Sequence, residues 1–256
     1  MKHFLLLAIC ITISSLVGCK KEAPDAQINV EKDFILEMRE NLSPGGNTLQ
    51  FLAETTAAQE CLHTGILLDL QKNTHRINLS FLELTEPAEC LPGTEPAQGS
   101  VPAGDLTMRD YTFQIDLRGE LESTGVLNVL EDRYVVSFSR QIGFEFSENI
   151  LLKVRPNMIW GYVNHSESET NNAREFTTAL REISDEIDPE PGNYGWFTTT
   201  ENGITAVADM PTERENILFL FTYSGSDEAI ENLLAQYRTD FPETDFNLFD
   251  YQGKSF

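Results

Sequence analysis

Basic residues are scarce in this chain of 256 residues. It contains 18 Lys and Arg against 41 Asp and Glu, which gives a formal net charge of −23. Proteins bind nucleic acids and anionic lipid surfaces through clusters of positive charge. The excess of acidic residues therefore argues against a nucleic-acid partner and against binding to anionic lipid through a basic face. Hydrophobic residues make up 41% and aromatics 10%, a globular rather than a disordered composition.

Recognised catalytic and nucleotide-binding motifs are also lacking. No GxGxxG, GxxxxGK[ST], HExxH, GxSxG or EF-hand loop occurs. A Ser-His-Asp site around His165 and Ser166 would lack a nucleophile elbow. We therefore expect no cofactor and assign no catalytic residue, and a non-enzymatic role is favoured over an enzymatic one.

One spacing is compatible with metal binding. His165, Glu167 and Glu169 occur at i, i+2 and i+4 after a strand-like run. On an extended chain these side chains share one face, and mixed imidazole and carboxylate ligands suit a divalent ion. The alternative, which we favour, is a solvated acidic loop in a chain already rich in carboxylates.

The N-terminus has the features of an export signal. Lys2 precedes an apolar stretch, Phe4 to Val17, whose 14 residues are too few for a bilayer span of about 20. Leu16-Val17-Gly18-Cys19 resembles the lipobox of bacterial lipoproteins. The resemblance implies cleavage before Cys19, acylation of that residue and a membrane-bound product. In this family an Asp after the acylated Cys often retains the protein at the inner membrane. Lys20 occupies that position, which favours the outer membrane. The side of the membrane on which the protein lies is left open.

Two cysteines remain in the exported body, since Cys10 leaves with the signal peptide. Cys61 and Cys90 flank two strand-like runs, His63–Leu70 and Arg76–Leu84. If these runs form a hairpin, both cysteines fall near its open end, so we predict a disulfide in an oxidising compartment. A reactive thiol or a metal ligand is the alternative.

The chain divides into four segments. We expect a signal peptide over residues 1–18, a tether over 19–27, one domain over 28–156 and a second over 157–256. Short strand-like runs at even spacing predict an antiparallel, immunoglobulin-like β-sandwich for the first domain. The approach of Pro102–Leu106 to Tyr111 resembles a tyrosine corner. The stretch from Leu91 to Gly104 is rich in Pro and Gly, which predicts a long exposed connection.

The second domain has helical patterns between strand-like runs. Phe176, Leu180, Ile183 and Ile187 form one stripe of a helix expected over Asn171–Ile187, and a second helix is expected over Asp227–Asp240. The order of elements resembles the ferredoxin-like α+β fold, with two helices on one face of an antiparallel sheet.

Such a sheet needs a cover on its second face. Ile217–Tyr223 is apolar on both faces, and aromatics are concentrated after residue 157. Large exposed apolar patches are uncommon on monomers, so the first domain, a second copy or a ligand should lie there.

These observations predict a lipid-anchored cell-envelope protein that acts as a binding or assembly module. Its expected partners are the membrane, through the anchor, and an envelope protein or a glycan. One alternative is an envelope hydrolase with a cleft between the two domains. The other is a structural or stress lipoprotein without a defined ligand.

Overall fold

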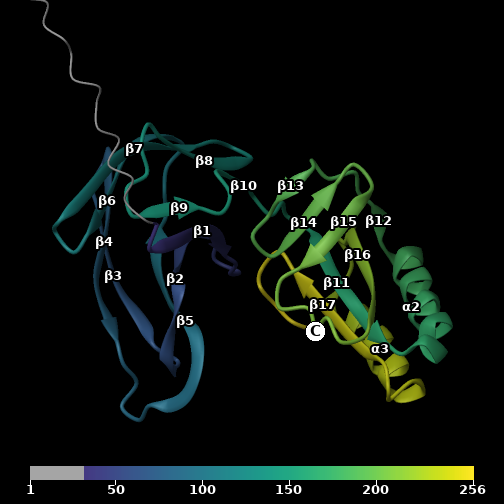
Figure 1. Ribbon diagram of the computed structural model, residues 1–256. Coiled ribbons are helices and arrows are strands. Elements are labelled where there is room, and N and C mark those ends of the chain that lie inside the picture. The colour runs from purple at the N-terminus through teal and green to yellow at the C-terminus, as the bar shows by residue number, and fades with distance from the viewer. Residues whose placement is uncertain (1–31) are drawn as a thin grey trace, which may run out of the picture. The chain divides into compact units, whose positions relative to one another are not determined.

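The computed structural model describes residues 32–256, all within the unit Glu31–Phe256 (Figure 1). Strands hold 54% of the described residues and helices 14%. Cys19 and the whole of the predicted signal peptide and tether lie outside this range. The domain boundary predicted between residues 156 and 157 lies inside this unit and stays a prediction.

The first ten strands form a single sheet, in the order β10-β8-β7-β6-β4-β3-β5-β2-β1-β9. Their bounds are β1 Phe34–Asn41, β2 Thr48–Leu62, β3 Gly65–Lys72, β4 Arg76–Thr85, β5 Leu91–Gly104, β6 Arg109–Leu117, β7 Leu121–Val129, β8 Arg133–Phe138, β9 Phe144–Phe146 and β10 Ile150–Leu152.

This sheet curls around one hydrophobic core to which all ten strands contribute. Its two edge strands, β9 and β10, are consecutive in the chain and joined by residues 147–149, so the sheet edges lie close together. Phe138 at the end of β8 packs against Phe144 of β9, with ring centroids 5.3 Å apart. The alternating burial of β1 and β6 shows one face turned to this core.

The predicted immunoglobulin-like sandwich is wrong. A sandwich divides its strands between two sheets, whereas here parallel pairings of β4 with β6 and of β1 with β9 join distant hairpins into one sheet. The local tyrosine motif is nevertheless present, because the Tyr111 hydroxyl accepts the Thr107 N–H at 3.1 Å.

The stretch Leu91–Gly104 is strand β5, not the exposed connection that its composition predicts. It pairs with β2 through three register shifts, which accommodate residues that cannot donate to a regular ladder. A side chain at Gly99 would meet the Ile66 carbonyl oxygen at 2.3 Å, so glycine is required for β5 to approach β3.

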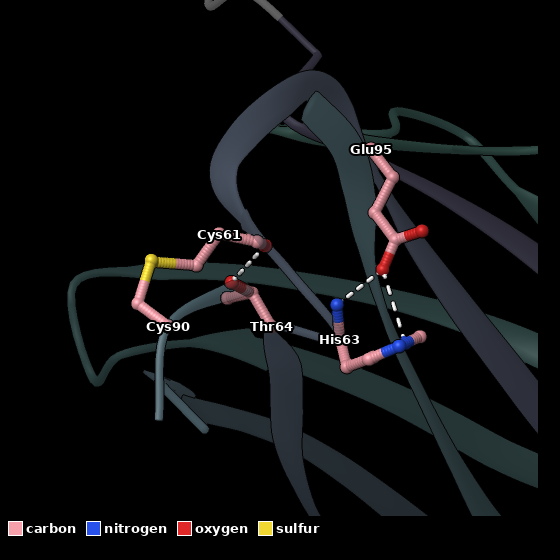
Figure 2. The surroundings of a disulfide bond; sticks show 5 residues. All are labelled: Cys61, His63, Thr64, Cys90 and Glu95. Atoms are coloured by element: carbon pink, nitrogen blue, oxygen red, sulfur yellow. Dashed lines mark hydrogen bonds and ion pairs between the residues drawn. A yellow bond between two sulfur atoms is a disulfide. The ribbon is translucent and has the colours of Figure 1, made fainter. Parts of the chain in front are cut away.

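The predicted disulfide is present. Cys61 and Cys90 are bonded with Cα atoms 5.1 Å apart (Figure 2). The hairpin inferred between them is also confirmed, since β3 and β4 pair antiparallel. The bond lies at the open end of this hairpin, where Thr64 donates to the Cys61 carbonyl at 2.8 Å and the backbone N–H of His63 donates to Glu95.

A second, four-stranded sheet follows, in the order β12-β16-β11-β17. Its strands are β11 Met158–His165, β12 Asp185–Glu186, β16 Glu215–Thr222 and β17 Asp245–Asp250. A one-turn η1, Glu167–Glu169, leads into helix α2, Thr170–Ile183, and helix α3 is Asp227–Asp240. Both helices lie along the same side of this sheet (Figure 1).

Helix α2 is shorter than its apolar stripe predicts. Phe176 and Leu180 are buried as expected, but the helix ends at Ile183, which is 43% exposed. Ser184 has extended backbone, and Asp185 already pairs with Thr222 of β16. Strand pairing therefore ends the helix four residues before Ile187.

The second face of this sheet is covered by a small three-stranded sheet. Its strands are β13 Gly192–Asn193, β14 Phe197–Thr200 and β15 Gly203–Val207. Trp160 of β11 packs on Phe197 with ring centroids 5.0 Å apart, and all eight residues of β11 are buried. The chain's own insertion therefore supplies much of the cover, and Leu42, Leu152 and Val154 of the expected first domain pack in the same cluster.

The predicted fold class as a whole is therefore wrong: the chain is mostly β, built on a ten-stranded curled sheet, and not a sandwich followed by a ferredoxin-like α+β domain. The small sheet consists of the antiparallel hairpin β14–β15, to which β13 adds a third strand. Neither α-helix among residues 32–256 combines the length and apolar character needed to cross a membrane.

Candidate functional site

The free edge of β16 is the feature of this fold that most resembles a binding site. On one side β16 pairs along its whole length with β11. On the other side only Thr222 and Phe221 have strand partners, the two residues of β12. No described strand pairs with Glu215–Leu220 on that side, so the edge presents unpaired backbone donors and acceptors.

Prolines explain why the edge stays free. After β12 the chain continues through Ile187, Asp188, Pro189, Glu190 and Pro191. Proline has no backbone N–H to donate to a ladder, and it also restricts the residue before it. The chain therefore leaves the sheet after Glu186 instead of extending β12 along β16.

The opposite edge of the same sheet shows what a covered edge looks like. There the C-terminal residues fold back on β17: the Phe256 N–H donates to the Leu248 carbonyl at 3.0 Å, and Ser255 forms an isolated bridge with Phe249. One edge of this sheet is thus covered by the chain itself, whereas the edge at β16 is open.

The open edge also lacks the features by which proteins usually protect an edge strand. Such features are prolines, bulges and charged residues along the strand. Residues 215–220 contain no proline, and the pairing of β16 with β11 has no register shift. The single charge, Glu215, is at the first residue, so the remainder of the edge is open to another strand.

One wall of the groove beside this edge is polar and comes from α2. The contributing side chains recur at helical spacing and so lie on one face of the helix: Thr170, Arg174, Thr177, Thr178 and Arg181.

The hydroxyls on this wall already donate to backbone carbonyls, that of Thr177 to Ala173 at 2.6 Å and that of Thr178 to Arg174 at 2.8 Å. Arg181 pairs with Glu186 at 3.3 Å. The guanidinium of Arg174 has no hydrogen bond or ion pair with the described residues.

The other wall is apolar. Its half-buried side chains all belong to the cluster between the second sheet and the small sheet: Ile187, Ile204, Leu218 and Leu220. The groove between the two walls has a volume of about 990 Å³. A six-residue edge at about 3.3 Å per residue is about 20 Å long, which is the length of a typical strand.

The three residues considered for metal binding do not share an extended face. His165 ends β11 and is buried, with its Nδ1 2.8 Å from the Ser166 carbonyl oxygen, whereas Glu167–Glu169 forms the helical turn η1. Glu169 accepts hydrogen bonds from the hydroxyl and the N–H of Ser166, which lower the pKa of its carboxyl. Across residues 32–256 no group of three potential ligands could hold a metal ion.

A buried carboxylate lies elsewhere, on β1. Glu40 is 2% exposed, and its Oε2 accepts the Val154 N–H at 2.8 Å while its backbone carbonyl accepts the Trp196 indole N–H at 2.7 Å. Burial raises its pKa, opposed by the Val154 bond and by the charge of Lys153. Glu40 lines none of the described grooves, so these contacts indicate a structural role in joining β1 to later segments.

Comparison with known proteins finds no matching family model, no matching curated protein and no matching solved structure. The groove is not among the sites predicted from sequence. Two local signals point to it in retrospect: the polar helical stripe from Thr170 to Arg181, and the two prolines that follow the short β12.

Proposed function

We propose that the protein is a lipid-anchored cell-envelope binding module, and that it holds an extended segment of another envelope protein against β16. The observation that carries this proposal is the unprotected edge Glu215–Leu220, which lines a groove. Strand addition supplies affinity through main-chain hydrogen bonds, and pockets for alternate side chains supply specificity. The anchor at Cys19 rests on the lipobox resemblance.

A protein segment suits this groove better than a glycan. Glycan sites usually offer exposed aromatic faces together with free hydrogen-bonding side chains, whereas the lining residues of this groove include only two aromatics, Phe219 and Phe221, both buried. Unpaired backbone groups along a strand match another backbone most directly.

A site-specific photo-crosslinker in the native host tests the proposal. Placed at Ile204, which faces the groove, it should attach one partner protein through an extended segment. Placed at the neighbouring Thr205, which is exposed and outside the groove lining, it should not. Equal labelling from both positions, cross-links to glycan alone or no groove-specific product would each overturn the proposal.

The alternative of an envelope hydrolase has less support. The only acidic side chains in the groove lining, Glu186 and Glu215, come from different strands at its two ends, and the carboxyl whose pKa burial raises, Glu40, lies outside it.

A further inference from the structure

The two walls of the groove differ in chemistry, and this difference bears on which peptide fits. A strand added to β16 continues the sheet, so its side chains point alternately to the two sheet faces. Ile217 and Phe219 of β16 face the cluster under the helices, whereas Leu218 and Leu220 face the small sheet. Added residues would therefore meet the polar α2 wall and the apolar wall in turn.

Resting on the proposed function, we infer that the partner segment alternates acidic and apolar residues, with a carboxylate opposite Arg174. This guanidinium is exposed, lines the groove and makes no ion pair with the described residues. The neighbouring threonine hydroxyls have committed their protons to backbone carbonyls. Of the two guanidinium groups on this wall, Arg181 already pairs with Glu186, whereas Arg174 has no carboxylate partner among the described residues. A guanidinium binds a carboxylate with charge-assisted hydrogen bonds.

The apolar positions of the segment follow from the opposite wall. Ile187 and Ile204 lie in the same apolar cluster as two leucines of β16 and leave them half-buried. These leucines are Leu218 and Leu220. Valine- or isoleucine-sized side chains would remove this surface from water at about 25 cal/mol per Å² of apolar area.

The acidity of the whole chain does not oppose this inference at short range. At 0.1 M ionic strength charges are screened over about 10 Å, so the net −23 slows the approach of an acidic segment more than it weakens a direct contact with Arg174. The groove carries negative charge mainly at its ends, at Glu186 and Glu215.

The test uses the full chain in detergent micelles and three hexapeptides, in which valine alternates with glutamate, glutamine or lysine. We expect the glutamate peptide to bind about fivefold more tightly than the glutamine peptide and the lysine peptide to bind weakest. The preference should disappear in Arg174→Gln. It should persist in Arg76→Gln, which removes an equal charge from an exposed position on β4.

Four outcomes separate the inference from the proposed function. Loss of the preference in Arg174→Gln alone supports the inference. Equal affinity for the glutamate and glutamine peptides, or an equal loss of the preference in both variants, overturns the inferred preference for acidic residues. Either result leaves the proposed strand addition standing. Unchanged binding of a backbone N-methylated glutamate peptide overturns strand addition. No binding of any peptide overturns both.

Discussion

The side chain of Glu40 and the backbone of Val154 are joined by a hydrogen bond of 2.8 Å, although 114 positions separate them. The same residue also receives the indole N–H of Trp196 on its carbonyl oxygen. Glu40 therefore connects β1 both to the residues after β10 and to the loop between β13 and β14. Because it is only 2% exposed, its ionisation should be coupled to folding.

Replacement of Glu40 by Gln should stabilise the protein relative to the wild type, and the difference in stability should grow as the pH rises. Burial raises the pKa of Glu40 in the folded protein, so its contribution to stability is complete below the unfolded pKa of 4.5. That contribution is lost as the pH increases through the folded pKa. Gln keeps an acceptor for the Val154 N–H and carries no charge.

Urea unfolding of both proteins between pH 4 and pH 8 checks this sign. The difference in free energy of unfolding, variant minus wild type, should increase with pH, and the subtraction cancels the general repulsion of an acidic chain. A difference that is flat with pH would contradict the assignment. Glu40→Ala, which leaves the Val154 N–H without its partner, should cost about 1–3 kcal/mol.

Removal of the disulfide should destabilise the protein without changing its fold. Cys61 and Cys90 are 29 residues apart, and closure of a loop of this size contributes about 3–4 kcal/mol by the chain-entropy estimate. The β3–β4 and β2–β5 ladders do not depend on the bond and should persist in the double variant Cys61→Ala/Cys90→Ala.

Chemical unfolding of this variant should match that of the wild-type protein measured in reductant. Equal stability of the oxidised wild type and the variant would mean that the bond constrains the unfolded chain very little.

The local parts of the fold could be predicted from sequence, and the long-range parts could not. The β3–β4 hairpin, its disulfide and helix α3 follow from neighbouring residues: alternation, a short turn and an apolar helical stripe. The parallel pairing of β4 with β6 has no such local signal, because register between distant strands depends on the whole core. The sandwich prediction failed for this reason.

The composition of β5 also misled the sequence interpretation. Pro92, Pro96 and Pro102 indicate a loop, yet each is paired with a residue of β2, and the register shifts of this ladder accommodate them. The groove was missed for a related reason. The prolines of Asp188–Gly192 are typical of a segment that ends a helix, and no local signal shows that they also leave the edge of β16 unpaired.

Truncation of Phe197 should expose the second face of the four-stranded sheet. This ring is 2% exposed and packs against Trp160 and Tyr194, with centroids 5.0 and 4.6 Å away. Phe197→Ala should cost about 3–5 kcal/mol, the usual range for a buried aromatic, and should increase the binding of a hydrophobic dye. Phe197→Leu should recover most of the loss. A small effect of the alanine variant would show that the insertion covers the sheet only loosely.

Replacement of Cys19 should release the protein from the membrane. Two or more acyl chains anchor a protein stably, at about 0.8 kcal/mol per buried CH₂, whereas an unacylated chain has only its acidic body. Cys19→Ala should abolish incorporation of labelled palmitate and move the protein to the soluble fraction. Cys10→Ala, altered within the predicted signal peptide, should remain anchored. Full membrane retention of the Cys19 variant would contradict the lipobox interpretation.

A bulky side chain in the groove should block the proposed partner without affecting folding. Thr178 is exposed, lies on the α2 wall and faces the space that an added strand would occupy. Thr178→Trp should fill this space and reduce the cross-link formed from Ile204 at least about tenfold. Because exposed helix positions tolerate substitution, the free energy of unfolding should change by about 0.5 kcal/mol or less.

Glu182→Trp provides the matched control, since Glu182 is exposed on the same helix and does not line the groove. It adds the same indole and should leave the cross-link intact. If both variants lose the cross-link equally, the partner recognises the outer surface of α2, and the edge of β16 is then only a solvated strand. If neither variant loses it, the partner does not enter the groove.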